Sequence, residues 1–409
     1  MDFDASRQHL PRYRQSTAAD LCRETAAVPS DACNADVQAL FTGRRELMSL
    51  PVLEHGRPIG LISRNIFMSQ MSKPFYQELY GKKSCIAFMD KEPLIVEASL
   101  SIEDLTFRAV ASGEKALADG FIITDRGELA GVGFGLQLMN VVATMQAERN
   151  RQIMHSIEYA SVIQRAVLKP SRDALALMPD AHLEWQPRDL VGGDFYLVEQ
   201  HGDGWFVALG DCTGHGVPGA FMTLIASQVL SQALLRVGPR APGRLLQAVS
   251  GGVKALLGQT TERRAAAESN DGLDAAFLWF EHATRRLHFA GARIALHLAA
   301  PGPQGPVLQV VEGERAGLGY VDTDPGQQWP THVLDLAPGT VLFVTSDGLT
   351  DQIGGPKAIA FGKRRVRDLL VAHAPEPSPV VGAALLQALA AWQGGQPRRD
   401  DLTFFCCRP

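Results

Sequence analysis

Four short acidic turns between residues 191 and 401 carry the side chains best suited to chemistry. Each turn adjoins an apolar run, and the four acids are Asp194, Asp211, Asp347 and Asp400. Carboxylate oxygens are the ligands that hard cations such as Mg²⁺ and Mn²⁺ prefer, and a few are enough because these ions keep several waters. The recurrence predicts one divalent-metal site shared by the four turns.

Glycine flanks these acids where the backbone has to turn sharply. Gly192 and Gly193 precede the first acid, and Gly348 follows the third. Glycine lets a backbone approach an ion or a phosphate closely. For any single turn, an ordinary Asp-Gly hairpin explains the same residues equally well. Only the repetition of the pattern favours a metal site.

Six sequence blocks extend the pattern of acidic turns. They are Gly-Gly-Asp-Phe-Tyr at 192–196, Asp-Cys-Thr-Gly-His-Gly-Val-Pro-Gly-Ala-Phe-Met at 211–222, Asp-Gly-Leu-Asp-Ala-Ala at 271–276, Ala-Gly-Ala-Arg at 290–293, Ser-Asp-Gly-Leu-Thr-Asp at 346–351 and Asp-Asp-Leu-Thr at 400–403. In this order the blocks resemble the SpoIIE-like bacterial branch of the metal-dependent serine/threonine protein phosphatases, the PPM or type 2C family. The resemblance covers roughly residues 155 to 409, the size of one large domain.

The resemblance implies two Mn²⁺ or Mg²⁺ ions, with a third in a weaker site. Asp211 would bridge the first two ions, and the backbone carbonyl of Cys212 would add a ligand to one of them. The other implied metal residues are Asp347 and Asp400 for the second ion, Asp194 through metal-bound water, and Asp351 together with Asp347 at the third site.

The implied reaction is hydrolysis of phosphoserine or phosphothreonine by metal-activated water, without a phosphoenzyme. The implied catalytic residues are Asp194, Asp211, Asp347, Asp400 and His215. His215 stands where a general acid for the leaving alkoxide would lie, although a structural role explains a glycine-flanked histidine equally well. Further candidates are Asp271 and Asp274 as metal ligands, and Arg188 and Arg293 for holding the phosphate.

Substrates in that family are commonly phosphorylated anti-sigma-factor antagonists with a STAS fold, dephosphorylated in partner-switching circuits. The resemblance therefore implies a phosphorylated regulatory protein of this type as the partner. Leu197 stands where the family often has an acid after the Gly-Gly-Asp-Phe-Tyr block. That departure leaves the implied metal ligands intact.

Other functions fit parts of the same motifs. The Gly-Gly-Asp-Phe run is similar to a motif of diguanylate cyclases, but position 196 is Tyr and that class has no counterpart of the later blocks. A cysteine-nucleophile phosphatase built on Cys212 would need a glycine-rich loop ending in arginine, and Pro218 stands there instead. Two alternatives stay open: a catalytically inactive, partner-binding scaffold of the same fold, and a phosphatase of small metabolites.

Composition predicts a soluble globular protein. Its 409 residues, 46% of them hydrophobic, favour two or three domains. A net charge of −5 argues against nucleic-acid binding as the main function. We find no signal sequence and no apolar span of membrane length, and the six cysteines form no CxxC pair. We therefore expect a cytoplasmic protein with reduced thiols and no membrane partner.

A strand-turn-strand-helix pattern occurs twice in the N-terminal part, near residues 49–62 and again near 120–136. The pair is similar to tandem cystathionine-β-synthase (CBS) domains, which often bind adenosine-containing ligands through a hydroxyl and a following Asp. Ser63 supplies the hydroxyl, but Ile66 replaces the Asp, and Gly133-Phe134-Gly135 occupies the second copy. A small-molecule ligand and a structural or dimerising role both stay open.

The segment 137–169 contains no Pro or Gly and predicts a helical connector. Its apolar or small residues are spaced four, three and seven apart at Ile153, Ile157, Ala160 and Val167. This spacing is typical of a parallel coiled coil and predicts a homodimer, although a single amphipathic helix explains the two clean heptads as well. We expect the N-terminal pair to adjust activity by moving this helix against the metal turns.

These inferences predict four parts. They are an N-terminal segment, 1–24; a CBS-like regulatory domain of α/β type, 25–145; a helical connector, 146–170; and a phosphatase domain, 171–409. Hairpin-length connections in the last part favour antiparallel pairing. The resemblance implies that this domain is an α+β fold, the PPM-type α-β-β-α sandwich of two antiparallel sheets flanked by helices, with metals at one end.

Overall fold

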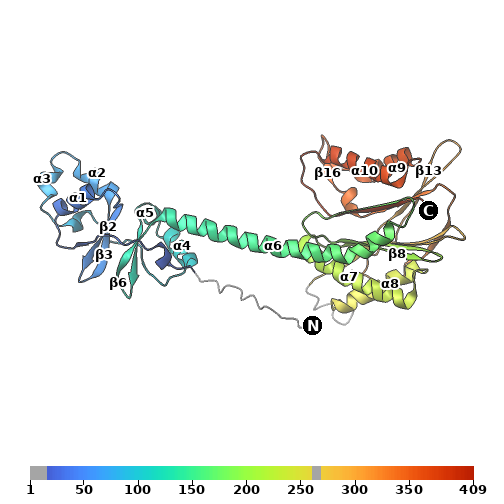
Figure 1. Ribbon diagram of the computed structural model, residues 1–409, viewed down its shortest axis with the longest axis horizontal. Helices are drawn as coiled ribbons and strands as arrows, with labels where there is room; N and C mark the ends of the chain where they lie inside the picture. The colour runs from blue at the N-terminus through green and yellow to red at the C-terminus, as the bar shows by residue number, and fades with distance from the viewer. Residues whose placement is uncertain (1–15, 260–268) are drawn as a thin grey trace, which may run out of the picture. The chain divides into compact units, whose positions relative to one another are not determined.

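The computed structural model describes residues 16–259 and 269–409 (Figure 1). The chain divides into two units, Met1–Gln152 and Ile153–Pro409. This division falls inside one continuous helix, α6 (Gly135–Leu175), which contains the segment predicted as the connector. The predicted N-terminal segment lies outside the described residues up to residue 15, and its remainder includes the 3-10 helix η1 (Ala18–Leu21).

The first unit contains one topology twice. Each copy is a sheet of three strands, in which the first strand runs parallel to the second and the second pairs antiparallel with the third. The strands are β1 (Val28–Pro29), β2 (Ser49–Glu54) and β3 (Arg57–Ser63) in one sheet, and β4 (Ile95–Glu97), β5 (Phe121–Asp125) and β6 (Glu128–Gly133) in the other.

Both hairpins of this unit turn through two residues with positive φ. These are His55 and Gly56 at 52° and 82°, and Arg126 and Gly127 at 54° and 82°. Positive φ at both turn residues matches the right-handed twist of the flanking strands. Each hairpin also has a register shift next to its turn. The duplication expected from the sequence is therefore present, while its assignment to the CBS family stays a prediction.

Helices cover the two small sheets and complete two separate cores. Phe41 and Phe67 are buried in the first core, and Leu105 and Phe121 in the second. The helices are α1 (Asn34–Gly43), α2 (Arg64–Met71), α3 (Tyr76–Tyr80) and η2 (Cys85–Phe88) in the first copy, and α4 (Ile102–Ala111), α5 (Glu114–Ala118) and the start of α6 in the second.

The second unit is built on two five-stranded antiparallel sheets. The first has the order β14-β11-β10-β9-β8, and the second β13-β12-β15-β18-β7. The strands are β7 (Ala181–Gln186), β8 (Asp194–His201), β9 (Gly204–Cys212), β10 (Leu273–Glu281), β11 (Arg286–Ala292), β12 (Leu296–Ala300), β13 (Val307–Val311), β14 (His332–Asp335), β15 (Val341–Thr345) and β18 (Leu402–Cys407).

A helical layer lies on the outer face of each sheet (Figure 1). Helices α7 (Gly216–Val237) and α8 (Pro242–Leu256) pack on the first sheet, and α9 (Gly362–His373) and α10 (Ser378–Gln393) pack on the second. The inner faces share one core, which includes Phe280 and Phe405. The expected α+β fold, with two antiparallel sheets between helices, is confirmed for this unit.

The central strands are apolar on both faces because both faces of each sheet are covered. Trp205 through Leu209 on β9 are all buried, and so are Leu402 through Cys407 on β18. Continuous apolar runs of this kind are typical of strands buried on both sides. The strands can therefore hold the polar residues at their ends in fixed positions.

Helix α7 corrects one expectation from the sequence, namely that the chain has no apolar span of membrane length. Among the described residues, α7 alone is long and apolar enough to cross a membrane by length and composition. Its apolar character has a structural cause, because Met222, Ala226 and Leu230 are buried against β8, β9 and α8. A core helix passes the same test.

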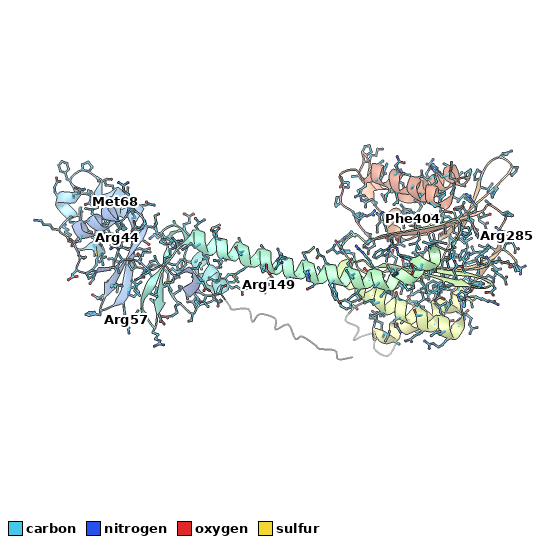
Figure 2. All side chains as sticks on the ribbon, viewed as in Figure 1. Arg44, Arg57, Met68, Arg149, Arg285 and Phe404 are labelled. Atoms are coloured by element: carbon cyan, nitrogen blue, oxygen red, sulfur yellow. The ribbon has the colours of Figure 1, made fainter. Side chains whose placement is uncertain are left out.

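Phe404 belongs to the second core, between its sheet and helices α9 and α10 (Figure 2). It is fully buried, so Phe404→Ala should destabilise the second unit by about 3–5 kcal/mol. Urea unfolding followed by tryptophan fluorescence measures this unit alone, because its five tryptophans are Trp185, Trp205, Trp279, Trp329 and Trp392.

Leu235→Ala is the control, since this side chain on α7 is 89% exposed. The control should shift the urea midpoint little, because an exposed leucine loses few contacts when it is truncated. Equal shifts of the urea midpoint in the two variants would contradict the placement of Phe404 in the core between the second sheet and its helices.

Candidate active site

Three acids of the first sheet lie side by side at one end of adjacent strands. Asp211 on β9 is the cross-strand partner of Asp194 on β8 and of Asp274 on β10. Directly opposed residues of antiparallel strands have Cβ atoms about 4.5–5.5 Å apart on the same face. Asp211 therefore lies between two other carboxylates.

Two further acids reach the same end from the second sheet. Strand β15 ends just before Ser346 and Asp347, and the antiparallel β18 begins at Leu402, two residues after Asp400. The backbone amide of Asp351 donates to the Asp347 carbonyl at 2.8 Å. This turn, which contains the 3-10 helix η4 (Asp347–Leu349), brings the predicted third-site acid beside Asp347.

Hydrogen bonds join the two sheets at this end. The Ser346 hydroxyl of the second sheet donates to Asp194 Oδ2 at 2.8 Å. Asp401 accepts hydrogen bonds from the backbone amides of Gly193 at 2.5 Å and Arg188 at 2.6 Å. All three bonds join segments that are distant in the sequence, so they fix the first acidic turn against the last two.

The acids repel one another. Burial, followed by repulsion from Asp194, Asp347, Asp400 and Asp274, raises the pKa of Asp211. Burial and the charge of Asp401 raise the pKa of Asp194 to about 7. Burial and the charges of Asp400 and Asp351 raise the pKa of Asp347 to about 6. A nearby positive charge would relieve this repulsion.

The donor set fits a hard divalent cation. All of its side-chain donors are carboxylate oxygens, and Asp194 Oδ1 is buried without a hydrogen bond among the described residues. In the same part of the chain, no three Asp, Glu, His or Cys side chains are already gathered in a metal-binding arrangement. Mg²⁺ and Mn²⁺ suit such sites because retained waters complete their coordination.

Two glycines allow the turns to approach one another. A Cβ at Gly193 would collide with the Gly214 carbonyl oxygen and lie 3.0 Å from that of Cys212. A Cβ at Gly348 would collide with the Asp401 carbonyl oxygen. These two positions require glycine because of close backbone contact, as the sequence pattern suggested.

Cys212 contributes backbone to this region, while its thiol is buried. Its amide donates to the Gly193 carbonyl at 3.1 Å. Burial, followed by the charges of Asp211 and Asp194, raises the pKa of the thiol. Nucleophilic cysteines need the thiolate form. The environment therefore disfavours a cysteine nucleophile.

His215 lies at the exposed rim, immediately before α7. Its Nδ1 is 3.2 Å from Asp189 Oδ2, and Arg188 Nη2 lies 3.2 Å from the same oxygen. Asp189 therefore orients His215 and Arg188 together. The same contacts are also consistent with the alternative role for His215, a structural one in a tight turn.

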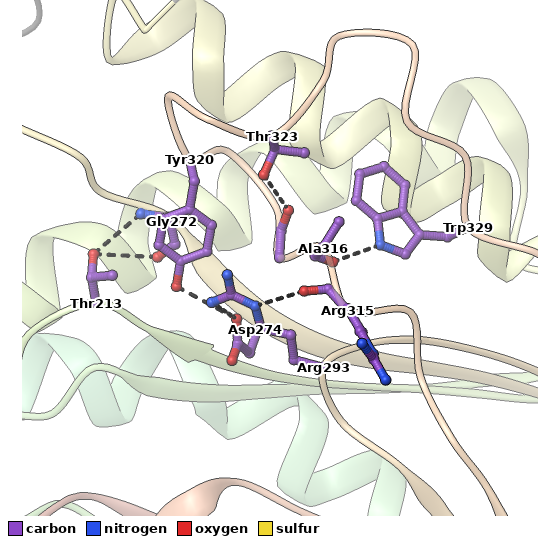
Figure 3. Close-up of polar contacts among 10 residues, drawn as sticks. Thr213, Gly272, Asp274, Arg293, Arg315, Ala316, Tyr320, Thr323 and Trp329 are labelled. Atoms are coloured by element: carbon purple, nitrogen blue, oxygen red, sulfur yellow. Dashed lines mark hydrogen bonds and ion pairs between the residues drawn. The ribbon is translucent and has the colours of Figure 1, made fainter.

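Arg293 is held beside Asp274 and Tyr320 (Figure 3). It has a left-handed backbone, with φ of 62°. Its Nη1 lies 3.3 Å from Asp274 Oδ1, its Nε donates to the Arg315 carbonyl at 3.1 Å, and its guanidinium lies 4.8 Å from the Tyr320 ring centre. Asp274 therefore already has a cationic partner.

Asp271 stabilises a loop. Thr213 Oγ1 donates to Asp271 Oδ1 at 2.9 Å, and the Gly272 amide donates to the Thr213 hydroxyl at 3.2 Å. The Thr213–Gly272 contact is drawn in Figure 3. These bonds join the turn after β9 to the start of β10.

Sequence reasoning assigned no role to three residues that position the site. Asp401 and Ser346 lie within matched blocks, where the neighbouring acids drew attention instead. Gln164 of α6 is buried, donates through Nε2 to the Gly192 carbonyl at 2.8 Å, and accepts from the Gly192 amide at 3.2 Å. Its only sequence signal is the Ile-Gln pair before the domain.

Comparison with known proteins agrees with this geometry. The Stage II sporulation protein E (SpoIIE) family matches residues 201–409. The SiaA-PP2C domain of Pseudomonas aeruginosa is 36% identical with a TM-score of 0.57, and the match covers 64% of this chain and 99% of that one. No curated protein sequence matches.

Two more distant structures are also similar. The RsbU and RsbW domains of a Mycobacterium tuberculosis protein are 19% identical, with a TM-score of 0.43 over 56% of this chain and 60% of that one. The SpoIIE phosphatase domain and regulatory fragment of Bacillus subtilis is 14% identical, with a TM-score of 0.43 over 56% and 63%. Because the family match spans just over half of its residues, this chain belongs to the SpoIIE family and carries a phosphatase domain of the PP2C type.

Proposed function

We propose that the protein is a metal-dependent phosphatase that hydrolyses phosphoserine or phosphothreonine on a regulatory protein. The observation that carries the proposal is the group of mutually repelling carboxylates at one end of the sandwich, centred on Asp211. Such a group stores negative charge where a divalent cation and a phosphoryl group would meet. A role as an inactive scaffold would not require these acids to be retained.

The proposed metal ligands are the residues that the strand ends bring together. They are Asp194, Asp211, Asp347, Asp400 and the Cys212 carbonyl, with Asp351 at a third site. When bound, Mn²⁺ or Mg²⁺ would supply positive charge that lowers the pKa of a coordinated water and neutralises the phosphoryl oxygens. Ser346 and Asp401 would position the ligands, because their hydrogen bonds fix Asp194 and Gly193.

His215 is the proposed proton donor. Asp189 lies against its Nδ1, so Nε2 is the ring nitrogen available to give a proton to the leaving serine or threonine oxygen. The exposed position of His215 at the rim suits contact with a protein substrate, whose phosphorylated side chain has to reach the acids from outside.

Exposed apolar side chains beside the rim favour a protein substrate over a small metabolite. Val217, Phe221 and Leu224 on α7 follow His215 closely and are 40%, 64% and 40% exposed. Contiguous exposed apolar residues are typical of protein interaction sites. The resemblance to SpoIIE-like phosphatases extends this proposal to a phosphorylated STAS-type antagonist in a partner-switching pathway.

The proposed regulation acts through α6. Gln164 bonds to Gly192, two residues before Asp194, and donates to Thr223 Oγ1 of α7 at 3.2 Å. Ile153 and Val167, two of the residues that predicted a coiled coil, are 53% and 45% exposed. We therefore propose a homodimer through this helix, in which the CBS-like unit and any small ligand that it binds alter the position of Gln164.

The first prediction concerns Asp211. Asp211→Asn should reduce Mn²⁺-dependent release of phosphate from a phosphopeptide by at least about 100-fold, because the central ligand loses its charge. It should also abolish the metal-dependent increase in thermal stability, which for one site reaches about 2.7 kcal/mol at a metal concentration of 100 times the Kd.

Asp335→Asn is the matched control. Asp335 lies on β14, and its side chain is 83% exposed, so this variant should keep both the activity and the stabilisation by Mn²⁺. Undiminished turnover in the Asp211→Asn protein would rule out the proposed site.

The second prediction concerns pH. In EDTA, the folded state holds protons on Asp194 and Asp347 that the unfolded chain releases, since their pKa values are raised to about 7 and about 6. The contribution of these two carboxyl groups to the free energy of unfolding should therefore fall as pH rises from about 4 to about 7. Asp194→Asn should flatten this dependence, and so should saturating Mg²⁺.

Urea unfolding followed by tryptophan fluorescence measures the pH effect. Histidines act in the opposite direction, because burial lowers the pKa of His288 and lowers that of His297 to about 4, so that their contribution to stability rises with pH near the unfolded value of about 6.5. The comparison with Asp194→Asn, which keeps both histidines, isolates the carboxyl contribution. An identical pH dependence in the wild-type and Asp194→Asn proteins in EDTA would contradict the prediction.

The third prediction concerns the contact between α6 and the first acidic turn. Gln164→Leu leaves the Gly192 amide and carbonyl buried without partners, which should cost about 1–3 kcal/mol of stability. It should also lower kcat, because Asp194 is no longer held through Gly192. Gln146→Leu on the exposed surface of the same helix is the control, and equal kcat values in the two variants would exclude this contact from regulation.

A further inference from the structure

A cavity of about 80 Å³ lies directly beside the acids, on the side of α9. Asp211 and Asp347 line it, together with Asp274 and Glu312. Four nitrogen-bearing side chains, which we call the basic pocket, line the same cavity: Arg293, His297, Lys363 and Arg367. The cavity therefore brings basic side chains close to the acids of the site.

His297 is a buried histidine that lines this cavity. It is 6% exposed, and neither Nδ1 nor Nε2 has a hydrogen-bond partner among the described residues. Strand β12 holds it opposite Phe343 on β15, the strand that leads into Asp347. Buried polar groups are nearly always hydrogen-bonded, so a polar group in the cavity is the natural partner of this imidazole.

Helix α9 supplies positive charge to the same place. Lys363 and Arg367 are four residues apart and therefore share one face of the helix. Arg367 Nη2 lies 3.6 Å from Glu312 Oε1, while its Nε is buried without a partner in the described part of the chain. Burial, followed by the charge of Arg367, lowers the pKa of His297 to about 4. The ring is therefore neutral near pH 7 and has one N–H to donate.

Arg293 lines the cavity beside Asp274. Its stacking on Tyr320 and its bond to the Arg315 carbonyl fix the guanidinium before any substrate arrives (Figure 3). A cavity of about 80 Å³ is far smaller than pockets for drug-sized ligands, which are about 300–1,000 Å³. A single tetrahedral oxyanion fits this size, and Arg293, Lys363 and Arg367 supply cationic groups for its oxygens.

We propose that the basic pocket is a phosphate subsite, which holds oxygens of the phosphoryl group during hydrolysis and of inorganic phosphate before release. The inference rests on the proposed phosphatase function and assigns a substrate-holding role to residues on α9 and β12. In the reaction, the phosphorus–oxygen bond to serine or threonine breaks with its electron pair, and that oxygen takes a proton. Water provides the new oxygen on phosphorus and loses one proton.

The direct test is binding of inorganic phosphate to the full-length protein in saturating Mg²⁺. In NMR spectra of ¹⁵N-histidine-labelled protein, the imidazole resonance of His297, identified by its absence in His297→Asn, should shift in a saturable manner. Lys363→Gln and Arg367→Gln should each weaken phosphate binding about tenfold, because each removes one charge-assisted hydrogen bond.

Arg364→Gln is the matched control, since it removes one charge from the same helix at a side chain that is 94% exposed. It should leave phosphate binding unchanged. Arg367→Gln removes the ion-pair partner of Glu312. If that loss unfolds the domain, Lys363→Gln still tests the proposal, because Lys363 is exposed and its substitution leaves the core intact.

Kinetics give a second readout. Lys363→Gln should raise both the KM for a phosphopeptide and the inhibition constant of phosphate about tenfold, with a smaller change in kcat. If the wild-type protein hydrolyses the phosphopeptide but His297 does not respond to phosphate, the subsite is overturned and the phosphatase stands. If His297 responds and no phosphopeptide is hydrolysed, the subsite stands and the phosphatase proposal fails.

Discussion

Repulsion among buried carboxylates is the constraint on which the rest of the second unit depends. Asp211 lies between Asp194 and Asp274 on adjacent strands, with Asp347 and Asp400 arriving from the other sheet. Such a cluster destabilises the domain in which it lies, since bringing like charges out of water is costly. The two covered sheets provide the rigidity that offsets this cost, and a bound divalent cation would remove much of it.

The hydrogen bonds at this end of the sandwich turn that constraint into a defined geometry. Ser346 fixes Asp194, and Asp401 fixes the backbone of Gly193 and Arg188. The bonds to Asp194 and Gly193 connect the first sheet to the second, and the bond to Arg188 joins the segments next to β7 and β18 of the second sheet. The acids are therefore held in place by residues that lack a ligand role of their own, and Gln164 gives α6 direct access to the same turn.

Charge is separated across the site over a short distance. The acids occupy the strand ends, while Arg293, His297, Lys363 and Arg367 line the adjoining cavity. A phosphoryl group has negative oxygens that need cations on more than one side, so a site with bound metal on one flank and basic side chains on the other matches its charge. Helix α9 thereby acquires a function beyond covering the second sheet.

The sequence by itself determined the fold class, the family and the identity of the acidic turns, because motif order, strand-length apolar runs and glycines next to acids are local properties. It also indicated the duplication in the first unit, through two similar hairpins. It could not identify Asp401, Ser346 or Gln164 as positioning residues, nor place His297 and Lys363 beside Asp347. Only the tertiary structure decided these, because each depends on contact between segments far apart in the chain, and no local spacing encodes which distant strand or helix a side chain will meet.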